Sequence, residues 1–412
     1  GPVGLALARL VGTRDNTHLL LPLHGRPSGS GCAQMPSIYV SAEAQNNSGT
    51  SESGTVESRP PHLRHNRGAL VLDNDGPAID WDSMIFSYQE TDRMYIAHCE
   101  EGGDWSPGVM QDFQDLSISP AAGVLNYGQG LFEGMKAQRA TDGSIVLFRP
   151  ERNAKRMQSG ASRLGIPVVP EEMFLDAVRQ TVIENIRWIP PIGKGALYIR
   201  PLLMGSGAIL GVAPAPEYTF LVYVSPVGPY FKGGLKPISL KVSDEFHRAA
   251  PGGSGGVKAI GNYAPGMVPS KDAKAQGFAE IIYLDAVHHK YVEEVGAANF
   301  FCINDGVIST PELTGTILPG VTRASVIEIA KDMGYDVREE KVDVDYALNA
   351  DECFCAGTAA VISSIGSIQH GDKVANFGDG EVGPITRILY DELTGIQQRR
   401  IPDEREWTVS IE

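Results

Sequence analysis

Segments with helical periodicity and segments with the composition of strands alternate along this chain, from about residue 80 to its end. Apolar side chains recur at helical spacing in three stretches, 151–165, 171–189 and 322–334. Runs typical of strands occupy 195–204, 218–225 and 299–303, and two strand–turn–strand patterns occupy 279–296 and 352–368. Such mixing excludes an all-helical or an all-strand chain. It predicts the α/β class, taken here to include α+β arrangements.

The length of 412 residues predicts more than one core. A segment rich in proline and glycine, 225–237, breaks the pattern of helices and strands and suggests a boundary. The first 65 residues are rich in Ser, Gly, Asn and Pro, with five arginines and four acidic residues, a composition typical of organelle transit peptides. An untargeted disordered tail is the alternative. We expect a disordered targeting segment over 1–65, a small α/β domain over 66–228, a linker over 229–238 and a large domain over 239–412.

The formal net charge of −15 argues against nucleic acid or an anionic membrane surface as a partner. The sequence has no apolar run long enough to span a bilayer. Its five cysteines are scattered and form no CxxC pair, so neither a disulfide framework nor a metal site is predicted. A reducing compartment is the simpler expectation.

The segment 252–266, GGSGGVKAIGNYAPG, holds one lysine, Lys258, inside a glycine run, with Asn262 and Tyr263 shortly after it. Glycines let a backbone approach a ligand closely. An amine presented on such a backbone, with a phenol nearby, suits a lysine that bonds covalently to a carbonyl compound. A flexible surface loop with a solvated lysine is the alternative.

Two turns are candidates for binding an anion. Gly320, Val321 and Thr322 open directly into the helix predicted over 322–334, where free backbone N–H groups would suit a phosphate. Thr358 and Ala359 lie in a turn of small residues between two apolar strands. An ordinary helix cap by Thr322 and a purely structural turn at 357–359 are the alternatives.

Two strands carry polar side chains of interest. Glu294 ends the second strand of the 279–296 hairpin, where its carboxylate could accept a hydrogen bond from a protonated ring nitrogen or simply be solvated. Tyr198 and Arg200 fall on one face of their strand, because side chains two apart point the same way. A phenol beside a guanidinium suits a carboxylate, although a surface cross-strand contact would give the same pattern.

Together these segments resemble the branched-chain amino acid aminotransferases, within the class IV, or fold type IV, pyridoxal-phosphate enzymes. The class IV signature is matched in three pieces: EVGAANFF from Glu294, IST at 308–310 and LPGVTR at 318–323. Four further stretches resemble the branched-chain subgroup, namely LNYGQGLFEGMKA (125–137), LFRPERNAKRM (147–157), LYIRP (197–201) and VKAIGNYAP (257–265). The resemblance implies a two-domain fold whose larger, C-terminal domain has a barrel-like sheet with helices.

The resemblance also implies roles for individual residues. Lys258 corresponds to the lysine that bonds to pyridoxal phosphate, and Glu294 to the partner of the cofactor's ring nitrogen. The other implied cofactor-binding residues are Tyr263 for the phenolic oxygen, and Arg156, Gly320, Val321, Thr322 and Thr358 for the phosphate. The implied substrate-binding residues are Phe86, Tyr127, Phe132, Tyr198, Arg200, Tyr230, Thr358 and Ala359.

The implied reaction is ping-pong transamination of leucine, isoleucine and valine with 2-oxoglutarate, giving branched 2-oxo acids and glutamate. The resemblance implies a homodimer, and the N-terminal composition predicts a plastid or mitochondrial location. A D-amino acid aminotransferase or an aminodeoxychorismate lyase would share Lys258 and Glu294. A non-catalytic scaffold with the same fold is a further alternative.

Overall fold

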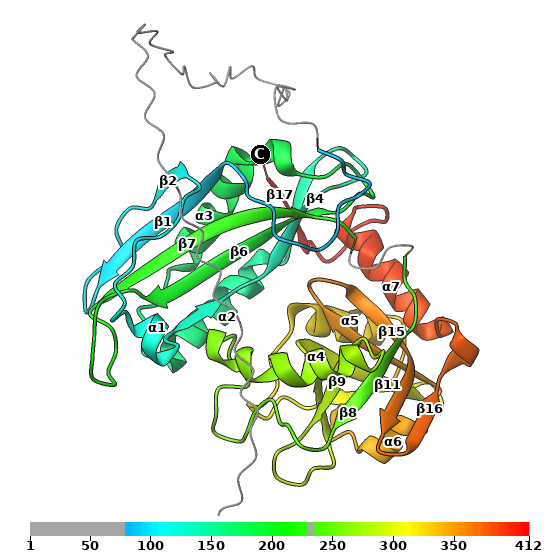
Figure 1. The fold of residues 1–412 in the computed structure, drawn as a ribbon. Helices are drawn as coiled ribbons and strands as arrows, with labels where there is room; N and C mark the ends of the chain where they lie inside the picture. The colour runs from blue at the N-terminus through cyan, green and yellow to red at the C-terminus, as the bar shows by residue number, and fades with distance from the viewer. Residues whose placement is uncertain (1–78, 230–233, 412) are drawn as a thin grey trace, which may run out of the picture. The chain divides into compact units, whose positions relative to one another are not determined.

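The computed structural model describes residues 79–229 and 234–411 (Figure 1). The predicted leader over 1–65 and Tyr230 therefore lie outside the described residues. The described chain forms two sheets. It leaves the first sheet after Val227 and enters the second at Ile238.

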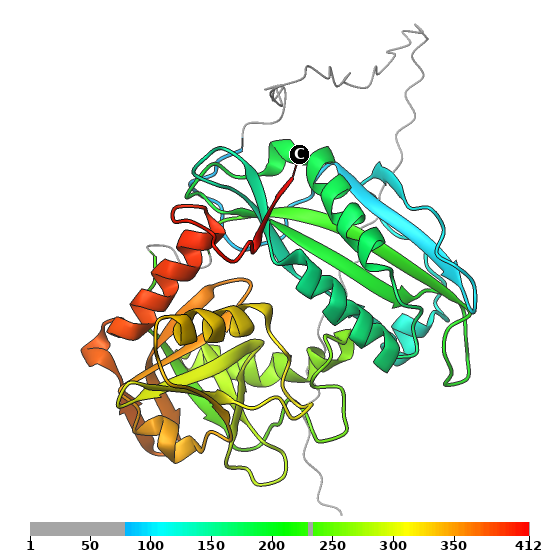
Figure 2. The same ribbon diagram turned by 180° about the vertical axis from the view of Figure 1, so that it is seen from behind.

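The first sheet is antiparallel throughout and is covered by two helices. Its strands run in the order β17-β5-β4-β6-β7-β1-β2, and β3 pairs with β6. Helices α2 and α3 lie side by side on one face of this sheet (Figure 2). The bounds are β1 Arg93–Glu100, β2 Val109–Asp112, α1 Gly123–Tyr127, β3 Gly130–Phe132, β4 Met135–Arg139, β5 Ile145–Phe148, α2 Pro150–Arg163, α3 Glu171–Glu184, β6 Ala196–Gly205, β7 Glu217–Val227 and β17 Thr408–Ile411.

The second sheet closes on itself. Strands β10-β9-β8-β15-β14-β11 pair in sequence, and β11 pairs back to β10, which gives a six-stranded barrel. This ring confirms the expected barrel-like sheet. Strands β12 and β13 extend the sheet from β11, and β16 pairs with β15. The bounds are β8 Ile238–Ser243, β9 Glu280–Leu284, β10 Val292–Val295, β11 Ala298–Asn304, β12 Val307–Pro311, β13 Val337–Glu340, β14 Glu352–Gly357, β15 Val361–His370 and β16 Lys373–Asn376.

Alternate side chains of the barrel strands belong to two different buried cores. Leu240, Ile282, Phe300, Cys353 and Ile365, each from a different strand of the ring, belong to one buried cluster. The neighbouring positions on β11 and β14 pack with the helices α5 (Val321–Asp332) and α7 (Pro384–Gln397) in another. A period of two places successive side chains on opposite faces of a strand, so β11 and β14 each contribute to both cores. The remaining helices of this part are α4 Met267–Ala275 and α6 Val344–Leu348.

The elements expected from the sequence are present with small shifts at their ends. The helix expected over 171–189 ends as α3 at Glu184, and a separate 3₁₀ turn, Ile186–Trp188, follows it. Pro150 occupies the first turn of α2, where its missing N–H costs no hydrogen bond. The last strand, β17, returns to pair with β5 of the first sheet. The domain limits at 66, 228 and 239 stay a prediction.

None of the helices in the described ranges is long and apolar enough to cross a membrane.

Candidate active site

Lys258 lies in a loop that is fixed at several points. The Phe132 amide donates to the Lys258 carbonyl at 3.2 Å, which ties the loop to β3. The Asn262 side chain donates to the carbonyls of Ser254 and Val257 at 2.7 and 2.9 Å. The Lys258 side chain is half-buried, and its Nζ donates to the Tyr263 hydroxyl at 3.1 Å. The alternative of a loose loop with a solvated lysine is therefore wrong.

The surroundings of Lys258 favour its neutral amine. Its Nζ lies 4.4 Å from the centre of the Phe132 ring. Burial lowers the pKa of the Lys258 amine to about 8, and the positive charges of Arg156 and Arg200 act in the same direction. A neutral amine is the form that attacks carbonyl carbon and accepts protons.

This lowered pKa predicts a pH dependence that can be measured on the apoenzyme. Covalent capture of added pyridoxal phosphate by Lys258, trapped with borohydride, should increase with pH around a midpoint near 8. The folded amine releases its proton near pH 8 and the unfolded amine near 10.5, so the unfolded state binds more protons between them. Folding stability from this group therefore rises with pH across that interval. A capture midpoint near 10.5 would contradict the assignment.

Arg200 lies among aromatic rings with little hydrogen bonding. Its Nη2 donates to the Tyr198 hydroxyl at 3.4 Å, which confirms that the two side chains share a face. The guanidinium carbon lies 4.6 Å from the centre of the Phe132 ring, and Nε is buried with no hydrogen-bond partner among the described residues. Phe86 packs edge-on against Tyr198 at 5.4 Å between ring centres. This arrangement offers a guanidinium at the side of an apolar, aromatic wall.

Glu294 is buried rather than solvated, with 1% of its surface exposed. It forms an ion pair with Arg248, and its Oε1 accepts from the Asn299 side chain at 3.1 Å. Burial raises the pKa of the Glu294 carboxyl to about 7, against the lowering effect of the Arg248 charge. A carboxyl group that titrates near neutrality can share a proton with a ring nitrogen.

Arg156 lies beside the first turn of α5. Its guanidinium forms two hydrogen bonds with the fully buried Glu133 carboxylate, at 2.8 and 2.7 Å, and donates to the Pro319 carbonyl at 3.0 Å. Helix α5 begins after Gly320 with no side-chain cap, so the alternative of a cap by Thr322 is wrong. A Cβ at Gly320 would lie 2.1 Å from the Asn299 Oδ1, which explains the glycine. A guanidinium and an uncapped helix end therefore meet at one place.

The turn of Thr358 and Ala359 is braced by residues 134–136. The Thr358 hydroxyl donates to the Gly134 carbonyl at 3.3 Å, and Lys136 Nζ donates to the Ala359 carbonyl at 2.6 Å. A Cβ at Gly134 would lie 2.1 Å from the Tyr198 hydroxyl, so glycine is needed there. The turn thus lies close to the Tyr198 side of the site.

The structure also shows where the remaining predicted residues lie. Tyr127 is exposed, and its hydroxyl donates to the carbonyl of Leu210, in the β6–β7 loop, rather than to the residues around Lys258. Four residues that the sequence analysis did not single out hold the site together, namely Glu133, Lys136, Arg248 and Asn299. Glu133, Lys136 and Asn299 fall inside the quoted motifs, whereas no sequence signal marked Arg248.

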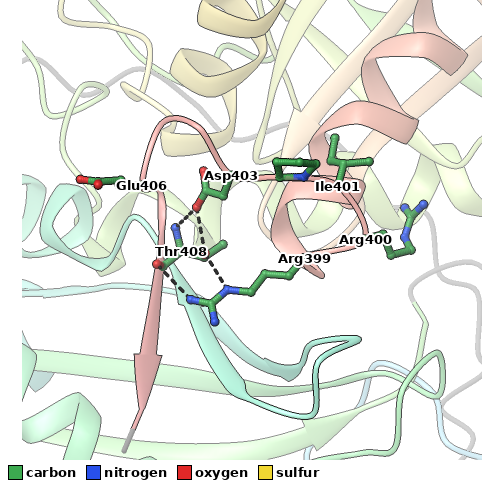
Figure 3. Close-up of a pocket in the computed structure, with 7 residues that line it drawn as sticks. Arg399, Arg400, Ile401, Asp403, Glu406 and Thr408 are labelled. Carbon is green, nitrogen blue, oxygen red and sulfur yellow. Dashed lines mark hydrogen bonds between the residues drawn. The ribbon is translucent and has the colours of Figure 1, made fainter.

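A separate pocket of about 690 Å³ lies between the end of α7 and β17 (Figure 3). Two of its charged side chains, Asp403 and Arg399, form hydrogen bonds with Thr408. The Asp403 carboxylate accepts from the Thr408 amide at 2.7 Å, and Arg399 donates to the Thr408 hydroxyl at 3.1 Å. None of the residues predicted for the active site lines it. Among the described residues, no group of three or more His, Cys, Asp or Glu side chains could hold a metal ion.

Comparison with known proteins identifies the family. The model of the amino-transferase class IV family matches residues 130–368. Branched-chain-amino-acid aminotransferase 3, chloroplastic, of Arabidopsis thaliana is 49% identical over 378 residues, which cover 91% of this chain and 92% of the relative. The chain belongs to the branched-chain aminotransferases of class IV. Branched-chain amino acid aminotransferase 2, chloroplastic, of Humulus lupulus is 55% identical to this aminotransferase over 334 residues, 81% of this chain and 82% of the relative.

A solved structure extends this likeness to the fold. The branched-chain amino acid aminotransferase from T.th., complexed with N-(5'-phosphopyridoxyl)-L-glutamate, superposes on this aminotransferase with a TM-score of 0.67 and 28% sequence identity. The match covers 79% of this chain and all of the solved one. It agrees with the expected fold type IV architecture.

Proposed function

We propose that this aminotransferase transfers the amino group of branched-chain L-amino acids to 2-oxoglutarate, with pyridoxal phosphate as its cofactor. The observation that carries the proposal is the setting of Lys258. Its half-buried amine, with a pKa lowered to about 8, lies near Arg156, Arg200 and Glu294, whose charges all act on it. An amine whose pKa is lowered by burial beside several charged groups is typical of a functional site.

The residues present fit the chemistry of pyridoxal phosphate. A guanidinium has five N–H donors. Three N–H groups of Arg156 donate to Glu133 or Pro319. The other two remain free to bind a phosphate beside the first turn of α5, which has no side-chain cap. Glu294 would accept a hydrogen bond from the ring nitrogen, and Tyr263 would hydrogen-bond the phenolic oxygen. When bound, the cofactor supplies an electron sink for charge that develops on the substrate's α-carbon.

The chain's own groups supply proton transfer and orientation. The neutral Lys258 amine would accept the proton of the substrate's α-carbon and hold it at Nζ. The Tyr263 hydroxyl, 3.1 Å from Nζ, orients this amine. The 358–359 turn and the Tyr198 hydroxyl would bind the α-carboxylate, so that the side chain faces the wall of Phe86 and Phe132.

Arg200 gives this apolar wall a way to accept an acidic substrate. We expect Arg200→Gln to raise the KM for 2-oxoglutarate about 10- to 100-fold, because a buried charge-assisted bond to the second carboxylate contributes about 1.5–3 kcal/mol. The KM for L-leucine should change much less, since its side chain is apolar. Steady-state kinetics with each substrate checks this, and equal losses for both would refute a selective role.

A substrate panel tests the proposed function. With 2-oxoglutarate as acceptor, L-leucine, L-isoleucine and L-valine should each be turned over, and D-alanine should not. The family comparisons do not favour a D-amino acid aminotransferase or an aminodeoxychorismate lyase. Preference for D-alanine, or no amino transfer at all, would overturn the proposal.

We further propose that the enzyme works as a homodimer, as the family resemblance implies. The β6–β7 loop exposes large apolar side chains, with Leu210 at 91% and Val212 at 88% exposure, beside Leu125 and Tyr127. Apolar side chains that gather on a surface indicate an interface. The Tyr127–Leu210 contact would then place the predicted substrate residue Tyr127 at that interface.

The proposed dimer predicts the effect of a charge in this loop. Leu210→Asp should shift the protein towards monomer and lower turnover of L-leucine at least about tenfold, because the variant buries an unpaired carboxylate on association. Light scattering and activity measured over a range of protein concentrations check this. The exposed Val109→Asp, on the edge strand β2, is the matched control. A fully dimeric and active Leu210 variant would contradict the proposed interface.

We also propose organelle targeting. It is supported by the composition of residues 1–65 and by the word chloroplastic in the names of both relatives. Fusion of residues 1–65 to a fluorescent reporter tests it, and a diffuse cytosolic signal would refute it.

A further inference from the structure

Arg149, which directly precedes helix α2, is buried although it carries a charge. Only 3% of its surface is exposed, and its guanidinium carbon lies 4.3 Å from the centre of the Trp407 ring. Its backbone has φ 47° and ψ 47°, a left-handed conformation that is uncommon for residues other than glycine. A buried charge and an unfavourable backbone both cost free energy, which indicates that the position of this side chain matters.

The Arg149 guanidinium holds helix α5 at two residues that lie about one turn apart. Its Nη1 donates to the Ser325 hydroxyl at 2.9 Å, and its Nη2 donates to Glu328 Oε1 at 3.0 Å. Ser325 is fully buried, whereas Glu328 is partly exposed. Arg156 lies about two turns further along α2, beside the first turn of α5. Helix α2 thus presents one arginine that fixes α5 and another at the proposed phosphate site.

Ser325 links Arg149 to the first peptide group of α5. Its hydroxyl accepts from Arg149 and donates to the Val321 carbonyl at 2.9 Å. That carbonyl belongs to the same planar peptide group as the Thr322 amide. The first N–H groups of a helix have no acceptor within the helix, and α5 has no side-chain cap. A carbonyl held by Ser325 therefore fixes the direction in which the Thr322 N–H points.

We propose that Arg149, acting through Ser325, is a positioning residue that orients the Thr322 amide towards the cofactor's phosphate. The proposal rests on the proposed function, in which Arg156 and the first turn of α5 bind that phosphate. Both terminal nitrogens of Arg149 donate to α5, so its effect on the phosphate is indirect. The hydrogen bond that the Val321 carbonyl accepts also polarises its peptide group, which makes the Thr322 N–H a stronger donor.

Pyridoxal phosphate and pyridoxal differ only in the phosphate group, so the ratio of their dissociation constants reports on phosphate binding alone. Both constants are measured by absorbance titration of the full chain freed of cofactor. Ser325→Ala should lower the preference for pyridoxal phosphate about three- to tenfold, the effect of losing one hydrogen bond, and leave the affinity for pyridoxal nearly unchanged. Arg149→Met should cause a similar loss. The double variant should lose no more than the larger single loss, since the two residues act in series.

Arg152→Met is the matched control, because Arg152 is an exposed arginine of the same helix and lies 3.9 Å from the same Glu328 carboxylate. It should leave the preference unchanged within a factor of about two. Arg156→Gln tests the phosphate site itself and should lower the preference more than either single variant. Thermal unfolding shows whether each variant folds, and Ser325→Ala alone decides if Arg149→Met does not.

Two results would overturn the role of Arg149. One is a wild-type preference in folded Ser325→Ala and Arg149→Met. The other is an equal loss of affinity for both compounds, which would show that Arg149 and Ser325 only stabilise the fold. In either case a loss of preference in Arg156→Gln would leave the proposed phosphate site standing, whereas a preference that survives Arg156→Gln would refute that site as well.

Discussion

Lys258→Ala is expected to lower turnover of L-leucine by roughly four orders of magnitude, the upper range for loss of a positioned proton-transfer group. The loss should appear in kcat, because the carboxylate-binding groups and the apolar wall remain. The cofactor should still bind, without a covalent bond, since Arg156 and the first turn of α5 are untouched. Stopped-flow absorbance and equilibrium dialysis measure the two quantities separately.

The matched control is Lys271→Ala, which removes an exposed lysine of the helix that follows the same loop. It should leave turnover unchanged within a factor of about two, as surface substitutions commonly do. A Lys258 variant that keeps wild-type kcat would refute the role assigned to this amine. A variant that loses the cofactor altogether would instead give Lys258 a role mainly in retention.

Glu294→Gln is expected to lower kcat about 10²- to 10³-fold, comparable to the loss of one electrostatic group in an active site. Glutamine keeps the shape of the side chain but cannot carry the negative charge that holds a proton on a ring nitrogen. Steady-state kinetics with L-leucine measures the loss. The exposed Glu245→Gln is the matched control and should have no effect.

A purely structural role for Glu294 can be separated from this one. Glu294→Ala leaves the Arg248 guanidinium buried without its carboxylate, which costs about 3–5 kcal/mol of stability. Adding Arg248→Met removes that cation and should restore much of the melting temperature, since the two effects are coupled. Activity should not return. Recovery of activity with stability would show that Glu294 acts only by packing against Arg248.

The local elements were predictable because their signals lie within short stretches of sequence. Tyr198 and Arg200 share a face as strand alternation requires, and α2 begins at Pro150, one residue before the expected start at 151. A barrel-like sheet was expected from the family resemblance, not from periodicity, and its closure by pairing of β10 with β11 was not predicted. The pairing of β17 with β5 joins residues about 260 apart in the chain, and no local pattern records such a contact.

The buried ion pairs of the site likewise could not be predicted from short stretches of sequence. Arg156 was predicted to hold a phosphate, but the fully buried Glu133 that binds its guanidinium was not. Arg248 reaches Glu294 from the segment between β8 and the Lys258 loop, and in sequence it is an ordinary arginine. The guanidinium groups of Arg156 and Arg248 matter because they are buried beside carboxylates, and burial depends on the tertiary fold. The sequence therefore marks the residues proposed to touch the cofactor better than those that hold them in place.

Borohydride reduction of the holoenzyme, followed by mass spectrometry of its peptides, tests the central claim most directly. The protein contains a second amine of similar character, because burial also lowers the pKa of Lys136 to about 8. Lys136 donates to the Ala359 carbonyl, whereas Lys258 faces Tyr263 and Phe132. We predict a single phosphopyridoxyl group, on Lys258. A modification on Lys136, or no modified lysine, would contradict the assignment.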